Sequence, residues 1–147
     1  MIIETLKSIF KRDLLKLRSE IELYENEANL WRVDQSIANS AGNLCLHLIG
    51  NLNAYIGVGL AGTAYIRKRD LEFSLKDVSR TELIRKIDEV IIVVEEGLNT
   101  LEGNSLDVDF PIVVWDKPTS IIYTLVHLST HLSYHLGQIN YHRRLLD

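Results

Sequence analysis

The segment IETLKSIFKRDLLKLRSEIELY, residues 3–24, decides the fold class, because its apolar side chains recur every three or four residues. This spacing places them on one face of a helix, while the charged side chains between them can face water. The apolar stripe consists of Ile3, Leu6, Phe10, Leu14, Leu17, Ile21 and Tyr24. The pattern predicts a long amphipathic helix that buries this stripe against other helices.

Three further segments, residues 40–57, 79–101 and 119–146, show the same helical period. The first of them begins at Ser36 or Ser40 and ends at a group of glycines. The last follows a proline and continues to the end of the chain. Four helices are therefore expected.

Two long connections separate these helices. Residues 59–78 are charged and show no period, whereas apolar and mostly polar residues alternate in the first half of 102–118, which allows a short extended piece. Ser79 and Glu82 have the spacing of a capping box, so a helix starts there. We expect one all-α domain over residues 1–147, folded as a four-helix bundle with long crossover connections.

Composition and charge limit the classes of function that are expected for this protein. The chain has 147 residues, 46% of them hydrophobic, and a formal net charge of −4, which is typical of a globular protein. Its basic clusters are short and offset by acids, so nucleic-acid binding is not expected. Cys45 is the only cysteine, which excludes a disulfide or thiolate zinc site within one chain, and it should point into the core. Without a secretory signal or an apolar run of about 18 residues, we expect a cytoplasmic protein that does not enter a membrane.

The spacing of the histidines indicates a possible metal site. Four of the five histidines lie in the last predicted helix. Each four-residue step turns a side chain by about 40° and raises it by about 6 Å, so His127, His131 and His135 share one face. Either neighbouring pair of this row can reach one ion, but all three cannot. His47 is the only other histidine on an internal helix face and would supply the third ligand. His142, near the chain end, is expected to be exposed or at an interface.

Three neutral imidazoles suit a divalent metal ion and leave one position for water, as in catalytic zinc sites. Such a water can lose a proton near neutral pH, and the sequence identifies no catalytic group beyond it. The alternative is that His47 is a hydrogen-bonded core residue and that the histidine pair lies on a solvated face. Three histidines on one apolar face favour the metal, because they are costly to bury without partners.

Two short segments resemble the metal motifs of the DinB-like (DinB/YfiT-like) proteins, HLIGNL at residues 47–52 and HLSYHLGQ at residues 131–138. The segment RKRDLEF, residues 67–73, resembles an uncharacterised subgroup of that family. The family folds as a four-helix bundle in which one histidine of the second helix and an HxxxH pair of the fourth bind a divalent metal. The resemblance covers nearly the whole chain in helix order.

The resemblance selects between the two histidine pairs. The family's pair ends directly before Gly-Gln, which implies His47, His131 and His135 as the ligands in this chain. His127 is then a core or cavity histidine, one turn earlier, with a hydrogen-bond partner. The expected ion is zinc or nickel, with iron or manganese as alternatives, because imidazole suits several of these metals.

Polar residues near the ligands could orient the imidazole rings through the nitrogen that does not bind the metal. Asn43 and Asn51 lie four residues on either side of His47. Gln138 lies three residues after the last ligand. The alternative for each is a polar helix residue bonded to the backbone or to water. The charged segment 67–72 either lines the mouth of the site or, as we favour, forms a loop stabilised by its own ion pairs.

The function that the resemblance implies is that of a metal-dependent enzyme. Relatives include thiol-dependent transferases and an isomerase, and others are suspected hydrolases. The expected reaction is attack by a low-molecular-weight thiol, bound to the ion as thiolate, on an electrophilic small molecule that enters between the long loops. The alternative is a non-catalytic dimeric bundle whose metal site is structural or vestigial.

A homodimer is expected from the run of apolar residues 90–94. These residues span more than one face of their helix, so Ile92 and Val93 need cover beyond the core. The connection 102–118 could supply it, or a second subunit, because two-fold dimers are the commonest soluble oligomers. The resemblance also favours a dimer.

Overall fold

The protein is all-helical, as predicted, in a computed structural model that describes residues 2–147. The elements in chain order are α1 (Ile2–Leu23), the 3₁₀ helix η1 (Glu27–Trp31), α2 (Ala41–Leu52), the π-helix η2 (Asn53–Ala61), α3 (Arg69–Ser74), α4 (Arg80–Asn99) and α5 (Ile121–Leu146). The described part of the chain thus has five α-helices rather than four. The additional one, α3, forms inside the connection that was expected to be irregular.

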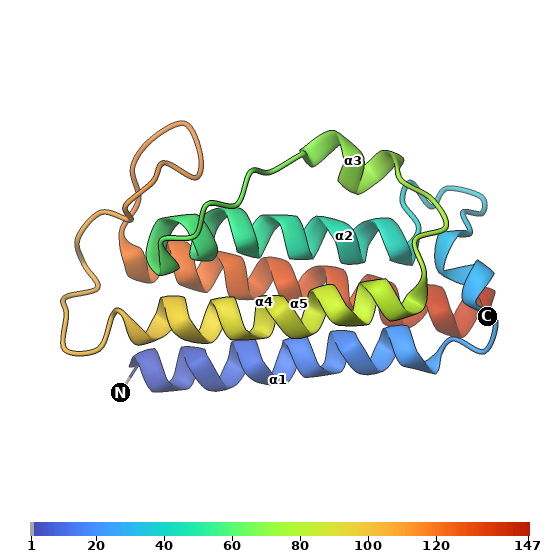
Figure 1. The fold of residues 1–147 in the computed structure, drawn as a ribbon, viewed down its shortest axis with the longest axis horizontal. Coiled ribbons are helices and arrows are strands. Elements are labelled where there is room, and N and C mark those ends of the chain that lie inside the picture. Colours follow the sequence, from blue (N-terminus) through green and yellow to red (C-terminus); the bar gives the residue numbers. More distant parts are fainter. Residues whose placement is uncertain (1) are drawn as a thin grey trace.

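Four of the α-helices are long and lie side by side (Figure 1). α1 packs against α4 and α5, and α2 packs against the same two helices. The short helix α3 lies on the outer side of α2. The connection between α4 and α5 loops out at the end of the molecule where α1 begins (Figure 1).

The core forms where the predicted apolar stripes meet. None of the seven residues of the first predicted stripe, six in α1 and Tyr24 directly after it, is more than 8% exposed, which confirms that stripe. α4 contributes its own buried row, namely Leu83, Ile87, Val90, Val94 and Leu98. Each fully buried aliphatic side chain stabilises the fold by about 1.5–3 kcal/mol, so these rows hold α1 and α4 together.

α2 is buried on every side, since all 12 of its residues are buried. Ser40 caps the helix by accepting a hydrogen bond from the backbone N–H of Asn43, so α2 starts at the later of the two predicted positions. The expected end at Gly57 is wrong, because the helix continues as η2. It stops at Gly62, whose φ of 68° requires the left-handed backbone that glycine adopts without strain.

Together α2 and η2 form one helix, Ala41–Ala61, that is long and apolar enough to cross a membrane by length and composition. This finding corrects the expectation that no segment reaches that threshold. The helix is 61% buried inside the protein, where it packs against α4 and α5. A core helix passes the same test of length and composition.

Serine caps set the starts of the last two helices. Ser79 accepts a hydrogen bond from the backbone N–H of Glu82, and Ser120 caps α5 in the same way. The second hydrogen bond of a capping box, from the backbone N–H of Ser79 to the Glu82 side chain, is missing among residues 2–147. The Glu82 carboxylate binds Arg85 instead. The extended piece expected before α5 is reduced, within residues 2–147, to one antiparallel bridge between Asp109 and Ser120.

Candidate metal centre

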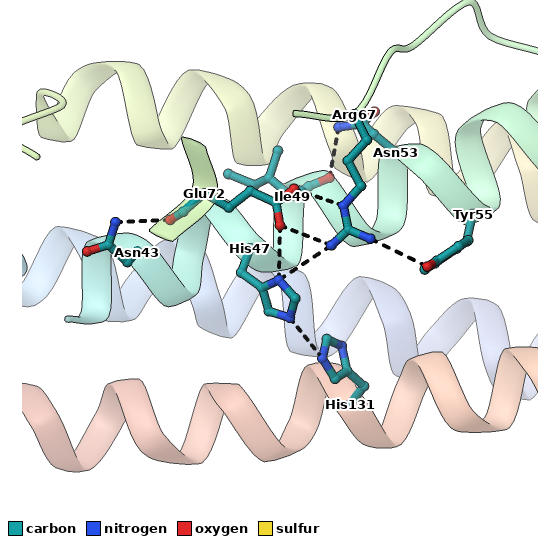
Figure 2. A network of polar contacts seen from close by, with 8 residues as sticks. All are labelled: Asn43, His47, Ile49, Asn53, Tyr55, Arg67, Glu72 and His131. Atoms are coloured by element: carbon teal, nitrogen blue, oxygen red, sulfur yellow. Dashed lines mark hydrogen bonds and ion pairs between the residues drawn. The ribbon is translucent and has the colours of Figure 1, made fainter. Parts of the chain in front are cut away.

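Three histidines converge between α2 and α5. His47 projects from α2, and His131 and His135 project from successive turns of α5, with one nitrogen of each ring within 4.8 Å of the others. The Nε2 atoms of His47 and His131 are 3.2 Å apart (Figure 2). Two nitrogens that share a tetrahedral ion, each about 2.0–2.1 Å from it, lie about 3.4 Å apart. The observed spacing therefore fits a shared metal ion.

The two cluster histidines on α5, His131 and His135, have pKa values below that of an ordinary histidine. Burial, together with the charges of the neighbouring histidines, lowers the pKa of His131 to about 4. Burial also lowers the pKa of His135, although its hydrogen bond with Gln138 acts in the opposite direction. Metals bind neutral imidazole, so neither ring has to lose a proton before it can bind one.

The ring of His47 is held from the side of α3 by Glu72, a contact that was not predicted from the sequence. Nδ1 of His47 donates to Oε1 of Glu72 over 3.0 Å, and neither side chain is more than 9% exposed. Arg67 binds the same carboxylate through Nε at 2.9 Å and Nη2 at 3.0 Å (Figure 2). Burial alone would raise the pKa of Glu72, but the hydrogen bonds from His47 and Arg67 leave this pKa below its usual value.

These contacts define which nitrogen of His47 faces the cluster. A carboxylate can only accept, so Nδ1 carries the ring proton and donates it to Glu72. The other nitrogen, Nε2, then presents a lone pair toward His131. This is the carboxylate–histidine arrangement that orients ligands in metal sites.

Gln138 makes the corresponding contact at His135, where its Oε1 lies 2.7 Å from Nδ1. His131 has no such partner, and its Nδ1 is buried without a hydrogen bond among the described residues. Two of the three rings therefore have an outer acceptor that fixes the ring, and the third is positioned by packing. The donor set as a whole fits a divalent metal ion.

His127 lies one turn earlier on α5 and is not a member of the three-histidine group. Its ring packs edge-to-face against Trp115, with centroids 4.5 Å apart, and stacks over His131 at a longer 6.4 Å. It also borders a pocket of about 580 Å³ whose wall includes Trp115 and Tyr123. The structure thus brings His47 together with His131 and leaves His127 beside the cluster.

Neither asparagine of α2 makes a hydrogen bond to the His47 ring in the described contacts. The Asn43 amide donates instead to the main-chain oxygens of Glu72 at 2.9 Å and Leu75 at 2.8 Å, which ties α3 to α2. Oδ1 of Asn51 is buried without a partner among residues 2–147. The orienting contact expected from these amides comes from Glu72.

The structure also shows where two other residues, Cys45 and His142, lie. Cys45 is fully buried in the core, where burial raises its pKa to about 12, and it is not part of the cluster. His142, expected to be exposed or at an interface, is only 4% exposed. Its ring binds the Tyr24 hydroxyl through Nδ1 at 2.7 Å and the carbonyl of Arg32 through Nε2 at 2.8 Å. It is therefore a structural histidine.

Comparison with known protein families assigns this chain to one family over nearly its whole length. The chain belongs to DUF1572, described as a protein of unknown function, whose family model matches residues 3–147. No curated protein and no solved structure gives a significant match. The matched region includes all three histidines.

Proposed function

We propose that this protein is a DinB-like metal-dependent enzyme, of the thiol-dependent transferase or hydrolase type, that holds one divalent ion with His47, His131 and His135. The observation that carries the proposal is the convergence of three imidazole nitrogens from two helices. The four long helices and the connections between them support the further proposal of a DinB-like four-helix bundle with long crossovers. In this proposal α3 is an addition within one crossover.

Zinc or nickel, with iron or manganese as alternatives, would act at this site as a Lewis acid. Glu72 and Gln138 orient two of the rings, and Arg67 balances the charge of the buried carboxylate. The pocket beside His127 is lined by Trp115 and has the size of a small-molecule site.

An open site favours an enzyme over a structural metal protein. Structural zinc sites have four protein ligands, whereas the candidate group within residues 2–147 has three members. This leaves a position for a substrate, for which we propose a small molecule such as a low-molecular-weight thiol. We propose a cytoplasmic homodimer that binds neither nucleic acid nor membranes, in keeping with the net charge of −4.

Metal analysis tests the proposal. The protein is purified without a metal-affinity tag, equilibrated with Zn²⁺ or Ni²⁺ and freed of excess ion. We expect about one ion per chain in the wild type and a large loss in His131→Ala. A wild type that retains no ion contradicts the metal site. A fourth protein ligand in the loaded protein would favour the non-catalytic alternative.

A further inference from the structure

We propose that Glu72 is a positioning residue of the metal centre, which fixes the tautomer of His47 so that Nε2 presents its lone pair to His131 and His135. This inference rests on the proposed metal site, but its first test uses metal-free protein. The sequence-based expectation placed Glu72 in a charged loop stabilised by its own ion pairs. The structure gives its carboxylate a second partner in the core.

The contact between Glu72 and His47 is buried, and it therefore determines which ring nitrogen of His47 carries the proton. The 3.0 Å bond joins a side chain 9% exposed to one 6% exposed, so water does not compete for either group. A hydrogen bond to an ionised acceptor is roughly twice as strong as one between neutral groups. Nδ1 of His47 therefore keeps the proton, and Nε2 stays free.

Arg67 holds Glu72 as a carboxylate and would reverse the tautomer if Glu72 were absent. Its guanidinium binds both carboxylate oxygens, packs 5.6 Å from the Tyr55 ring centroid, and brings Nη2 to 3.4 Å from Nδ1 of His47. A guanidinium can only donate. Without Glu72, Nη2 would donate to Nδ1, and the ring proton of His47 would move to Nε2, where it blocks metal binding.

The surface of α2 is shaped to receive the carboxylate. A Cβ atom built on Gly50 would lie 1.9 Å from Oε2 of Glu72, so the carboxylate occupies the space that a side chain would fill. On the other side, the amide of Asn43 holds the main-chain oxygen of Glu72. α3 is thus docked so that its one buried side chain, Glu72, reaches His47.

The tautomer can be read directly by long-range ¹H–¹⁵N NMR of metal-free protein labelled at histidine. We expect His47 to be protonated at Nδ1 in the wild type and at Nε2 in Glu72→Ala. Asp70→Asn removes the same charge from an exposed position of α3 and should leave the wild-type pattern. Gly50→Ala, which displaces the carboxylate without removing it, should act like Glu72→Ala and replaces it if that variant does not fold.

Zn²⁺ affinity, measured by competition with a chromophoric chelator, is the second readout. Loss of an outer partner of a metal ligand typically lowers affinity 10- to 100-fold, so we expect a loss of about that size in Glu72→Ala and none in Asp70→Asn. If wild-type His47 is protonated at Nε2, or if its tautomer is unchanged in Glu72→Ala, the positioning role is overturned, even where affinity falls. If the wild type binds no Zn²⁺, the proposed function fails, and the NMR result still decides the role of Glu72.

Discussion

Each ring of the cluster should be needed for metal binding, whereas His127 should not. His47→Ala, His131→Ala and His135→Ala each remove one of three donors, so each should weaken Zn²⁺ binding by more than the roughly 10- to 100-fold typical of an outer partner. His127→Ala should change it little, because that ring packs on Trp115. Calorimetric titration of the four variants measures this. A loss of binding in His127→Ala together with retention in His135→Ala would mean that the other histidine pair binds the ion.

The partly buried His131 should make the metal-free protein sensitive to acid. Its pKa is about 4 in the fold and 6.5 in the unfolded chain, so between these values the unfolded chain takes up a proton that the native protein does not. The free energy of unfolding should therefore fall as the pH drops from about 6.5 to 4.

Urea denaturation in the presence of a chelator, at pH 7 and pH 5, measures this dependence. His131→Gln removes the titrating group, so the variant should lose less stability between the two pH values than the wild type does. An equal loss in both proteins would show that His131 is not held neutral by the fold. The lowered pKa also means that protons compete with a metal for this ring only in more acidic solution than for a free histidine.

Alanine substitutions at two helical glycines should change the stability of the protein in opposite directions. A Cβ on Gly97 of α4 would lie 2.6 Å from Cγ2 and 3.2 Å from the backbone oxygen of Ile56 in η2, so Gly97→Ala should destabilise the protein by about 1–3 kcal/mol. Gly137 in α5 has nothing within 4 Å of such an atom. Gly137→Ala should stabilise the protein by about 0.5–1 kcal/mol, because alanine loses less backbone entropy in a helix.

Denaturant unfolding of both variants tests the close packing of α4 on η2. Equal changes in the free energy of unfolding for Gly97→Ala and Gly137→Ala would contradict it. The second substitution also serves as the control, because it makes the same chemical change in the interior of an exposed helix segment.

The long helices could be predicted from the sequence because their apolar period is a local property of the chain. α3 could not, since Glu72 is the only buried residue among its six and an apolar stripe is therefore absent. The sequence predicts the end of the second helix too early, at Gly57, because glycine is typically a helix breaker. In the structure Gly57 gives room for a neighbouring helix, with Val93 only 3.2 Å from the position of a Cβ.

In the candidate site, too, features set by nearby residues in the chain could be predicted, whereas a contact between distant residues could not. The spacing of His131 and His135, with the resemblance to a known motif, was enough to select them and His47. The contact of His47 with Glu72 joins residues 25 apart in the chain, across η2 and a connection whose path no spacing rule predicts. The acidic residues of the segment 67–72, together with the small Gly50 three residues after His47, are a sequence signal that could have suggested it.

For the whole molecule, we predict a homodimer. Ile92 of α4 is 57% exposed, whereas Val93 is partly buried and lies close to Gly57 of η2. Light scattering at micromolar concentration should give about twice the chain mass of 16.8 kDa, and Ile92→Glu should shift the protein toward monomer. α5 exposes a second set of large side chains, among them Tyr134 at 65%, so Tyr134→Glu is the matched comparison. A monomeric wild type would contradict the dimer.

Anomalous X-ray diffraction from crystals of Zn²⁺-loaded protein tests whether one ion is held by His47, His131 and His135. Data collected on either side of the zinc absorption edge locate the ion without reference to the protein's geometry. We expect one strong peak per chain, about 2.0–2.1 Å from Nε2 of all three histidines. A peak elsewhere on the chain, or one bound by His127 in place of His135, would contradict it.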